Sequence, residues 1–179
     1  MTTVALDKVP AGTWTIDPMH STVGFSIRHL MGKVRGTFEE FTGSVTTAAR
    51  PSDCSATATV AMSSVNTGVR MRDDDLRSAN FFDIDRFPHM VFEGTGLTEN
   101  DGLFEICGKL MIRGVTRDIA MGVEFLGFDE TGLQGEQRIG FSAATTIRRS
   151  DFGVGAVGEG EKVVVGDKVT VLLDVQAVR

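Results

Sequence analysis

Cysteine and proline are scarce in this chain. It contains two cysteines and four prolines, together with a single tryptophan and no tyrosine. Neither Cys54 nor Cys107 belongs to a CxxC motif, so we expect two buried free thiols in a reducing compartment. A disulfide between them would require oxidising surroundings.

Long hydrophobic runs and positive charge are also lacking. No run of 18 apolar residues exists, which excludes a membrane-spanning helix by length. The first residues lack a basic stretch followed by an apolar core, so we expect no secretory signal and a cytoplasmic location. The net charge of −6, with only the Arg148–Arg149 pair of adjacent basic residues, disfavours nucleic acid as a partner.

What the chain does contain is typical of one β-rich globular domain. Apolar residues make up 41% of it and charged residues 23%, which disfavours disorder. The 21 glycines suit a sheet protein with many tight turns. We therefore predict a single domain over residues 1–179, in which residues 1–11 form a flexible N-terminal segment.

Apolar and polar residues alternate in short runs separated by Gly, Asp and Asn turns. The clearest run is His20–His29, where Val23, Phe25 and Ile27 share one face and His29 continues it. The other expected strands cover residues 12–17, 32–45, 54–62, 89–94, 103–112, 118–126, 139–148 and 163–177. About eight strands in this pattern predict an antiparallel barrel or sandwich. Small residues on the strands (Gly24, Ala56, Ala58 and Ala143) and the length of the last strand favour a barrel with room for one small ligand.

The alternation stops between Arg70 and Asp83. Three consecutive acids, residues 73–75, would lie in the first turn of a helix and Arg77 near its end, where each suits the helix dipole. We predict one short helix over residues 69–79, with Phe81 and Phe82 pinning its end to an apolar surface. Such a helix is expected to cover the mouth of the barrel.

Several residues with possible chemistry have simpler structural interpretations. The three histidines lack metal-site spacing, and His29 is either a structural residue or a polar contact for a ligand head group. Residues 73–75 are better explained as a solvated helix start, paired with Arg72 and Arg77, than as a cation site. Residues 153–158 match GxGxxG, but without a βαβ context we interpret them as a flexible connection. Met31, Met71 and Met90 are candidates for lining a ligand channel, because methionine side chains adapt to irregular apolar shapes.

Taken together, the motifs resemble those of the YceI-like family of polyisoprenoid-binding, lipocalin-like barrels. The resemblance rests on the segments WTID (14–17), FSIRH (25–29), GTF (36–38), FFD (81–83) and LMIRGVT (110–116), and on Arg149 with DFG (151–153). It implies an all-β, extended eight-stranded antiparallel barrel, a homodimer, and a long isoprenoid or similar amphiphile in the lumen, with no catalytic chemistry. Asp75 stands where the family often has His, and Asn80 where it often has an acid.

We therefore predict a non-enzymatic binding or carrier protein for a hydrophobic small molecule, without a metal or catalytic cofactor. The bound molecule is expected to be an isoprenoid or quinone-like lipid. The expected lining residues are Val23, Phe25, Ile27, Phe38, Phe81, Phe82 and Phe92, and the polar residues of the mouth are His29, Arg72 and Asp75. Two alternatives remain: an enzyme that uses His29 or Asp75 as a general base on a bound lipid, and a ligand-free interaction or dimerisation module.

Overall fold

The computed structural model describes residues 6–155 and 164–179. These residues form strands, short 3-10 helices and the helix α1 (Arg70–Arg77), which lies within the range expected from the sequence. The strands are β1 (Gly12–Ile16), β2 (Thr22–His29), β3 (Gly32–Phe38), β4 (Phe41–Thr47), β5 (Ser55–Ala61), β6 (Val65–Asn66), β7 (His89–Asn100), β8 (Leu103–Ile112), β9 (Val115–Asp129), β10 (Arg138–Arg148) and β11 (Val165–Val178).

The sheet closes on itself. Following the pairings β1–β4–β5–β7–β8–β9–β10–β11 leads back to β1, which gives a closed ring of eight antiparallel strands. The closing contact is short and pairs Thr15 with Val178 and Ile16 with Ala177. The predicted eight-stranded barrel is confirmed.

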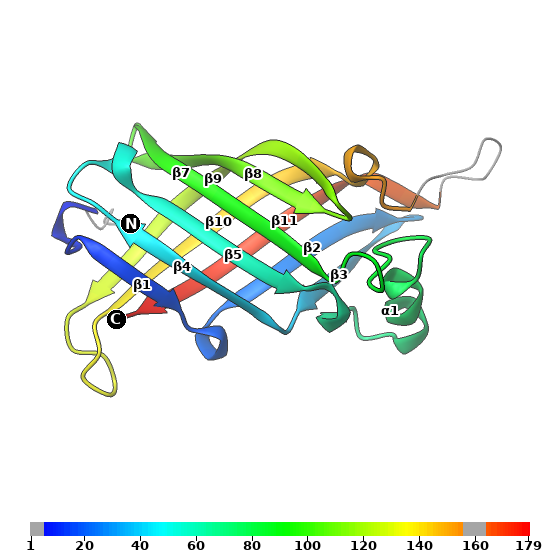
Figure 1. Cartoon of the computed structure of the whole chain (residues 1–179), viewed down its shortest axis with the longest axis horizontal. Helices are drawn as coiled ribbons and strands as arrows, with labels where there is room; N and C mark the ends of the chain where they lie inside the picture. The colour runs from blue at the N-terminus through cyan, green and yellow to red at the C-terminus, as the bar shows by residue number, and fades with distance from the viewer. Residues whose placement is uncertain (1–5, 156–163) are drawn as a thin grey trace.

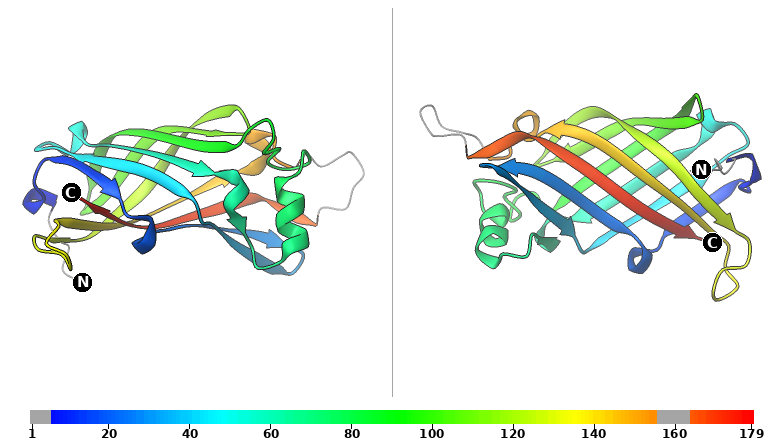
Figure 2. Two further views of the ribbon diagram at one scale, coloured as in Figure 1. Left: turned by 60° about the horizontal axis from the view of Figure 1, so that its bottom comes forward. Right: turned by 180° about the vertical axis from the view of Figure 1, so that it is seen from behind.

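Strands β2, β3 and β6 lengthen the wall at one end of this ring. β2 pairs with β11 beyond the point where β1 leaves it, β3 pairs with β2, and β6 pairs with β3. Helix α1 lies at the same end, opposite the end that carries the C-terminus (Figures 1 and 2). The barrel therefore has an α1 end and a C-terminal end.

The alternation of side chains decides what each strand buries. In β8, Phe104, Ile106 and Leu110 are buried while Glu105, Cys107 and Lys109 are exposed. Cys54 is buried and Cys107 is exposed, so the expectation of two buried thiols was wrong for Cys107. The period of two places Cys107 on the outer face, beside two charged residues.

Strand β7 is longer than the sequence suggested. We expected a strand that ends at Gly94, but β7 continues to Asn100 through a register shift between Thr95 and Leu97. Gly96 has a φ of +77° at this point, in a region that glycine adopts without steric cost. Gly96 therefore lies in a bulge within β7, and the strand continues beyond Gly94, where we expected it to end.

The C-terminal end is filled by an apolar cluster around Trp14. Trp14 is fully buried, packs with Val9, Ile139 and Ala177, and donates a hydrogen bond of 2.8 Å from Nε1 to the Thr47 hydroxyl. Val9 follows a 3-10 turn over Leu6–Lys8, so part of the segment expected to be flexible is packed against the barrel. Residues 1–5 and 156–163 lie outside the described residues, and with them residues 156–158 of the expected flexible connection.

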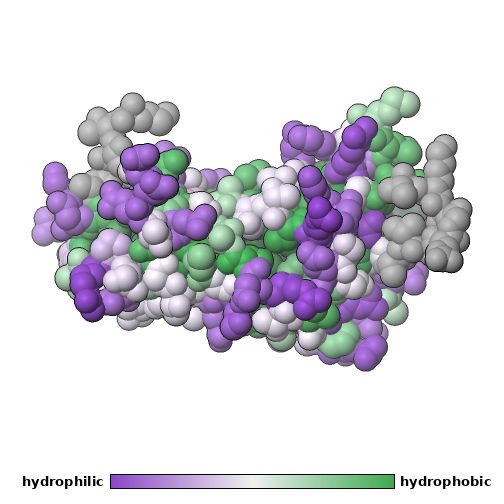
Figure 3. All heavy atoms as spheres, turned by 90° about the horizontal axis from the view of Figure 1, so that it is seen from above, coloured by the Kyte–Doolittle hydropathy of each residue, from purple (hydrophilic) through white to green (hydrophobic). Residues whose placement is uncertain are grey.

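The outer surface mixes hydrophilic and hydrophobic side chains on the face shown in Figure 3. None of the helices in the described part of the chain is long and apolar enough to span a membrane.

Candidate ligand-binding site

The barrel interior contains a cavity of about 290 Å³. It follows β2 from Val23 to His29 and reaches as deep as Met121 and Val175. Trp14 and its cluster do not line the cavity, so the cavity ends before it reaches the cluster at the C-terminal end. At the α1 end Asp75, which is exposed to solvent, forms part of the lining. The cavity is therefore closed at the C-terminal end and meets solvent at the α1 end.

All ten residues singled out from the sequence line this cavity. They are Val23, Phe25, Ile27, His29, Phe38, Arg72, Asp75, Phe81, Phe82 and Phe92. Every residue of β2 from Val23 to Ile27 remains partly accessible, because its inner face borders open space rather than a filled core. Of the three methionines expected to line a channel, only Met90 lines the cavity. Met31 and Met71 are exposed on the surface, which corrects that expectation.

Three phenylalanines link the barrel wall to the segment that follows α1. The ring centroids of Phe25 and Phe38 are 5.6 Å apart, and those of Phe38 and Phe82 are 6.0 Å apart. Gly36 is required beneath Phe25, since a Cβ at that position would lie 2.5 Å from the ring. This stack places Phe82 at the mouth of the cavity.

Helix α1 is held at the mouth by hydrogen bonds to the segment before it. The buried Asp73 carboxylate accepts hydrogen bonds from the Thr67 amide at 2.9 Å and the Thr67 hydroxyl at 2.6 Å. Arg72 Nε donates to the same hydroxyl at 2.7 Å, and Arg77 donates to the carbonyls of Ser63 and Val65. These contacts fix the side of α1 that faces the barrel.

The three consecutive acids of α1 have three different environments. The expectation of a solvated helix start fails for Asp73, which is buried. Asp74 pairs with Arg77 at 3.0 Å on the surface, and Asp75 lies at the mouth of the cavity. In the described part of the chain, no group of three or more His, Cys, Asp or Glu side chains converges as a metal site would require.

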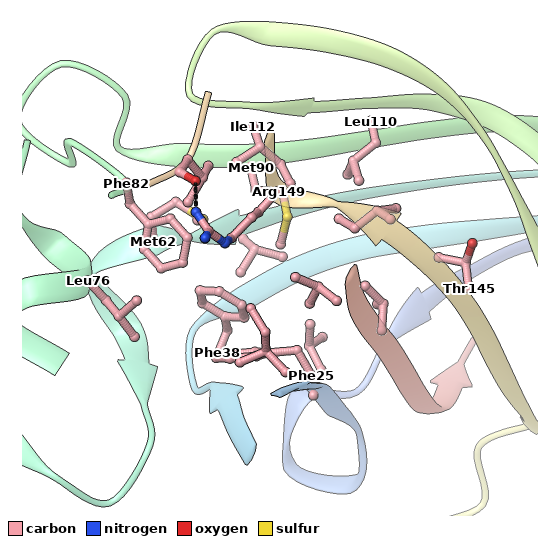
Figure 4. Close-up of a pocket in the computed structure, with 18 of the residues that line it drawn as sticks. Phe25, Phe38, Met62, Leu76, Phe82, Met90, Leu110, Ile112, Thr145 and Arg149 are labelled. Carbon is pink, nitrogen blue, oxygen red and sulfur yellow. Dashed lines mark hydrogen bonds between the residues drawn. The ribbon is translucent and has the colours of Figure 1, made fainter. Parts of the chain in front are cut away.

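Arg149 is the functional candidate that the sequence reasoning missed. Its buried side chain lines the cavity at the α1 end beside Met62, Phe82 and Ile112 (Figure 4). Nε donates to the Gly166 carbonyl at 2.8 Å and Nη2 to the Val165 carbonyl at 3.2 Å, while Nη1 donates to the carbonyls of Val154 and Gly155. The sequence did mark Arg149 as part of a motif that resembles the family, together with residues 151–153, but not as a residue of the cavity.

These contacts use four of the five N–H groups of Arg149. No described carboxylate lies within 4.0 Å of the guanidinium, so its direct contacts in that part of the chain are carbonyl oxygens, and the nearby Asp167 acts on its charge only at longer range. Burial of the nearby Asp167 carboxyl opposes its ionisation. Hydrogen bonds from Ser150 and the charges of Arg149 and Arg148 outweigh that effect, and the pKa of Asp167 lies below its ordinary value.

The polar groups of the cavity are concentrated at its open end. His29, Arg72, Asp75 and Arg149 belong to the α1 end, whereas the deeper lining is apolar apart from the Thr145 hydroxyl. The Thr145 hydroxyl donates to the Ala120 carbonyl at 2.8 Å and is therefore satisfied within the wall. An apolar tube with charges only at its mouth matches an elongated molecule that has one polar end.

A closed antiparallel barrel with an apolar lumen open at one end defines the class of β-barrels that can enclose a small molecule. The YceI-like domain matches residues 14–177, and the chain belongs to this family. The resemblance stated from the sequence motifs is thereby confirmed.

Curated relatives and solved structures agree with this assignment. A UPF0312 protein of Staphylococcus aureus strain N315 is 37% identical over 143 residues, which cover 79% of this chain and 81% of the relative. The crystal structure of BcnA from Burkholderia cenocepacia has a TM-score of 0.81 at 24% identity and covers 90% of this chain and 99% of its own. A polyisoprenoid-binding domain from Saccharophagus degradans has a TM-score of 0.71 at 16% identity, with 92% and 97% coverage. These two structures show the common fold.

Proposed function

We propose that the protein binds one long-chain isoprenoid, or a similar amphiphile such as a quinone-like lipid, in the lumen of the barrel and carries it without chemical change. The observation that supports this most is the distribution of polarity in the cavity. The apolar wall suits a hydrocarbon tail, and His29, Arg72, Asp75 and Arg149 are available to the head group at the mouth. The structural neighbour from Saccharophagus degradans, which has the same fold, is described as a polyisoprenoid-binding domain.

The size of the lumen favours one slender ligand. A volume of about 290 Å³ is at the lower end of the range of about 300–1,000 Å³ for small-molecule pockets. Each CH₂ that leaves water gains about 0.8 kcal/mol, but a membrane offers nearly the same gain. Transfer of the tail between membrane and lumen is therefore close to neutral, and selection depends on the shape of the lumen and on the mouth.

At the mouth, Arg149 favours an oxygen-rich or anionic head group. No described carboxylate lies within 4.0 Å of its buried guanidinium, and one of its N–H groups makes no hydrogen bond to the described residues. A phosphate or quinone oxygen would provide an acceptor. Arg72, although bonded to Thr67, adds a second positive charge to the lining.

No contact in the described structure favours the enzymatic alternative. A general base needs a partner that orients it, and the side chains of His29 and Asp75 make no hydrogen bonds to other described residues. We therefore assign both residues to contact with the head group.

The test is native mass spectrometry of freshly purified protein, followed by extraction and analysis of the released lipid. We expect one isoprenoid-type lipid per chain, recovered unchanged after prolonged incubation, and a homodimeric assembly in the same spectra. Conversion of the lipid during incubation would support the enzyme. A ligand-free mass, with no uptake of offered polyprenols or quinones, would overturn the proposal and favour the interaction or dimerisation module.

A further inference from the structure

The hairpin between β2 and β3 ends in two exposed apolar side chains. His29 pairs with Gly32, so Leu30 and Met31 form a two-residue loop at the α1 end of the barrel. Leu30 is 57% exposed and Met31 is fully exposed. Such loops usually contain Asn, Asp or Gly, which adopt positive φ readily, yet Leu30 has a φ of +52°. We call Leu30 and Met31 the hairpin tip.

Beside the hairpin tip, exposed basic residues cover the outer face of four neighbouring strands. We call these residues, Arg28, Lys33, Arg35, Arg148 and Lys168, the basic row. Arg28 lies directly opposite Lys33 on β2 and β3, and Arg148 lies directly opposite Lys168 on β10 and β11. β11 and β2 are adjacent, so the two pairs belong to one continuous face, which is in the foreground in the right-hand view of Figure 2.

Like charges directly opposite each other destabilise a sheet. None of the five residues of the basic row forms a salt bridge with a described carboxylate, although the chain as a whole has a net charge of −6. Arg148 does interact at longer range with the nearby Asp167, whose pKa its charge lowers. The repulsion between Arg28 and Lys33, however, costs stability that no described salt bridge offsets. An anionic surface outside the protein would offset that cost.

We propose that the hairpin tip and the basic row dock the α1 end of the barrel onto an anionic lipid bilayer. Leu30 and Met31 enter the boundary between head groups and acyl chains, and the basic row contacts lipid phosphates. Interfacial proteins combine apolar insertion with electrostatic attraction in this way. The hairpin tip directly follows His29, which lines the lumen, so the docked surface adjoins the open end of the cavity.

A soluble anion is a weaker match to the same features. It would use the basic row but would give no reason for two exposed apolar side chains at the end of the hairpin. A bilayer uses both features at once, because Leu30 and Met31 lie on the same hairpin as Arg28 and Lys33. The docking proposal does not depend on what occupies the lumen.

The experiment is cosedimentation of the purified protein with vesicles of phosphatidylcholine, with and without phosphatidylglycerol. We expect binding to the anionic vesicles that weakens as salt is raised. Arg28→Gln/Lys168→Gln should lose roughly 30-fold in affinity, since each basic side chain near an anionic surface contributes about fivefold. Leu30→Asn/Met31→Ser should lose at least about tenfold by removing the inserted groups, and Asn tolerates the positive φ of Leu30.

Matched controls separate this surface from general charge and hydrophobicity. Arg50→Gln/Lys109→Gln removes the same charge from two exposed residues outside the basic row, and Leu133→Ser removes an equally exposed apolar side chain. Both controls should bind the vesicles like the unaltered protein. Absence of binding to anionic vesicles, or equal losses in the controls and the row variant, would overturn the proposal.

Two further measurements distinguish membrane docking from binding of a soluble anion and from binding of lipid in the lumen. One outcome is that Arg28→Gln/Lys168→Gln loses vesicle binding, Leu30→Asn/Met31→Ser does not, and inorganic phosphate competes with the vesicles. This outcome would indicate a site for a soluble anion and overturn membrane docking. Ala58→Phe, which narrows the lumen, should abolish co-purification of lipid but leave vesicle binding unchanged. Failure of docking is thus distinguishable from failure of the proposed carrier function.

Discussion

Arg138 and Asp17 are 121 residues apart in the sequence, and their side chains meet at 2.8 Å beside the closing contact of the barrel. Asp17 directly follows β1, and Arg138 begins β10. The same guanidinium nitrogen donates to the Gln176 side chain on β11 at 2.9 Å, and the Asp17 amide donates to the Gln176 carbonyl at 2.8 Å. This network reinforces a strand pairing that consists of only two residue pairs.

The Arg138–Asp17 pair predicts a dependence of stability on pH. The hydrogen bond from Arg138 is the main cause that holds the pKa of Asp17 below its ordinary value, with further contributions from His20 and the Met19 amide against the opposing effect of burial. A lowered folded-state pKa adds stability above the unfolded value of about 3.9, and this stability is lost as the pH falls through the folded-state pKa.

Arg138→Gln should therefore lower the free energy of unfolding by roughly 1–2 kcal/mol at neutral pH through loss of the contact with Asp17. Arg138 also donates hydrogen bonds to Glu136 and is the main cause that holds the pKa of that carboxyl below its ordinary value, so the loss there depends on pH in the same direction. The difference from the unaltered protein should shrink as the pH falls below about 4. Urea denaturation at a series of pH values measures it. Arg50→Gln, which breaks an exposed pair with Asp53, is the control and should have little effect. A loss in Arg138→Gln that is independent of pH would contradict this explanation.

Arg149 is expected to stabilise the α1 end of the lumen. Its side chain ties the carbonyls of Val154 and Gly155 to those of Val165 and Gly166. Arg149→Met should cost about 2–3 kcal/mol, because it leaves several carbonyls without their donors. Arg149→Lys should recover only part of this loss, since an ammonium has fewer and differently arranged donors. Thermal unfolding of both variants measures the effect.

The neighbouring Arg148 is the natural control for Arg149. It is exposed and faces Lys168, so Arg148→Met should be neutral or slightly stabilising through relief of like-charge repulsion. Equal destabilisation by Arg148→Met and Arg149→Met would show that the carbonyl contacts are not the cause.

The lumen can be filled by a single substitution. Ala58 lines the cavity from β5, opposite Gly43 on one side and Phe92 on the other. Ala58→Phe should reduce co-purified lipid to a small fraction of the unaltered level, because the ring occupies the space of the tail. Thr59→Phe places the same side chain at the adjacent, exposed position and should leave lipid content unchanged. Extraction and quantification of lipid per chain compares them, and equal lipid content would place the ligand outside the lumen.

Trp14 provides a probe of folding that is separate from the lumen. It is the single tryptophan, it is fully buried, and it does not line the cavity. Its fluorescence should therefore report unfolding and remain nearly unchanged when lipid is extracted. Trp14→Ala should cost about 3–5 kcal/mol in denaturant unfolding, as expected for a large aromatic side chain removed from a core. A strong response of Trp14 emission to lipid removal would show that the apolar cluster and the lumen are coupled.

The sequence could predict which residues of β2 share a face because its alternation is unbroken, but it did not settle which face points inward. A strand with Val23, Phe25 and Ile27 on one side has a single choice of face once the barrel closes. The helix was predictable for a related reason, since residues 70–77 interrupt the strand pattern and carry charges suited to the helix dipole. The single domain, the homodimer and the cytoplasmic location stay predictions.

Other features depend on hydrogen bonds and turns of the folded chain that the pattern of residue types does not show. Asp73 was expected in solvent, but the hydrogen bonds from Thr67 draw its carboxylate inward. Arg149 reads as one half of a surface pair until the strands bring four carbonyls around it. The exposure of Met31 likewise follows from its place at the end of a hairpin and not from its residue type.

The Trp14 cluster closes the C-terminal end of the barrel, so in the part of the chain that the structure describes the lumen has one opening, at the α1 end. For the proposed function, this means that a lipid enters tail first and leaves head first through the same opening. The distance from that opening to the cluster sets an upper limit on the number of tail carbons that fit. In the proposed carrier, substitutions that deepen the closed end of the cavity or fill it should therefore change the length of the lipid that the protein selects.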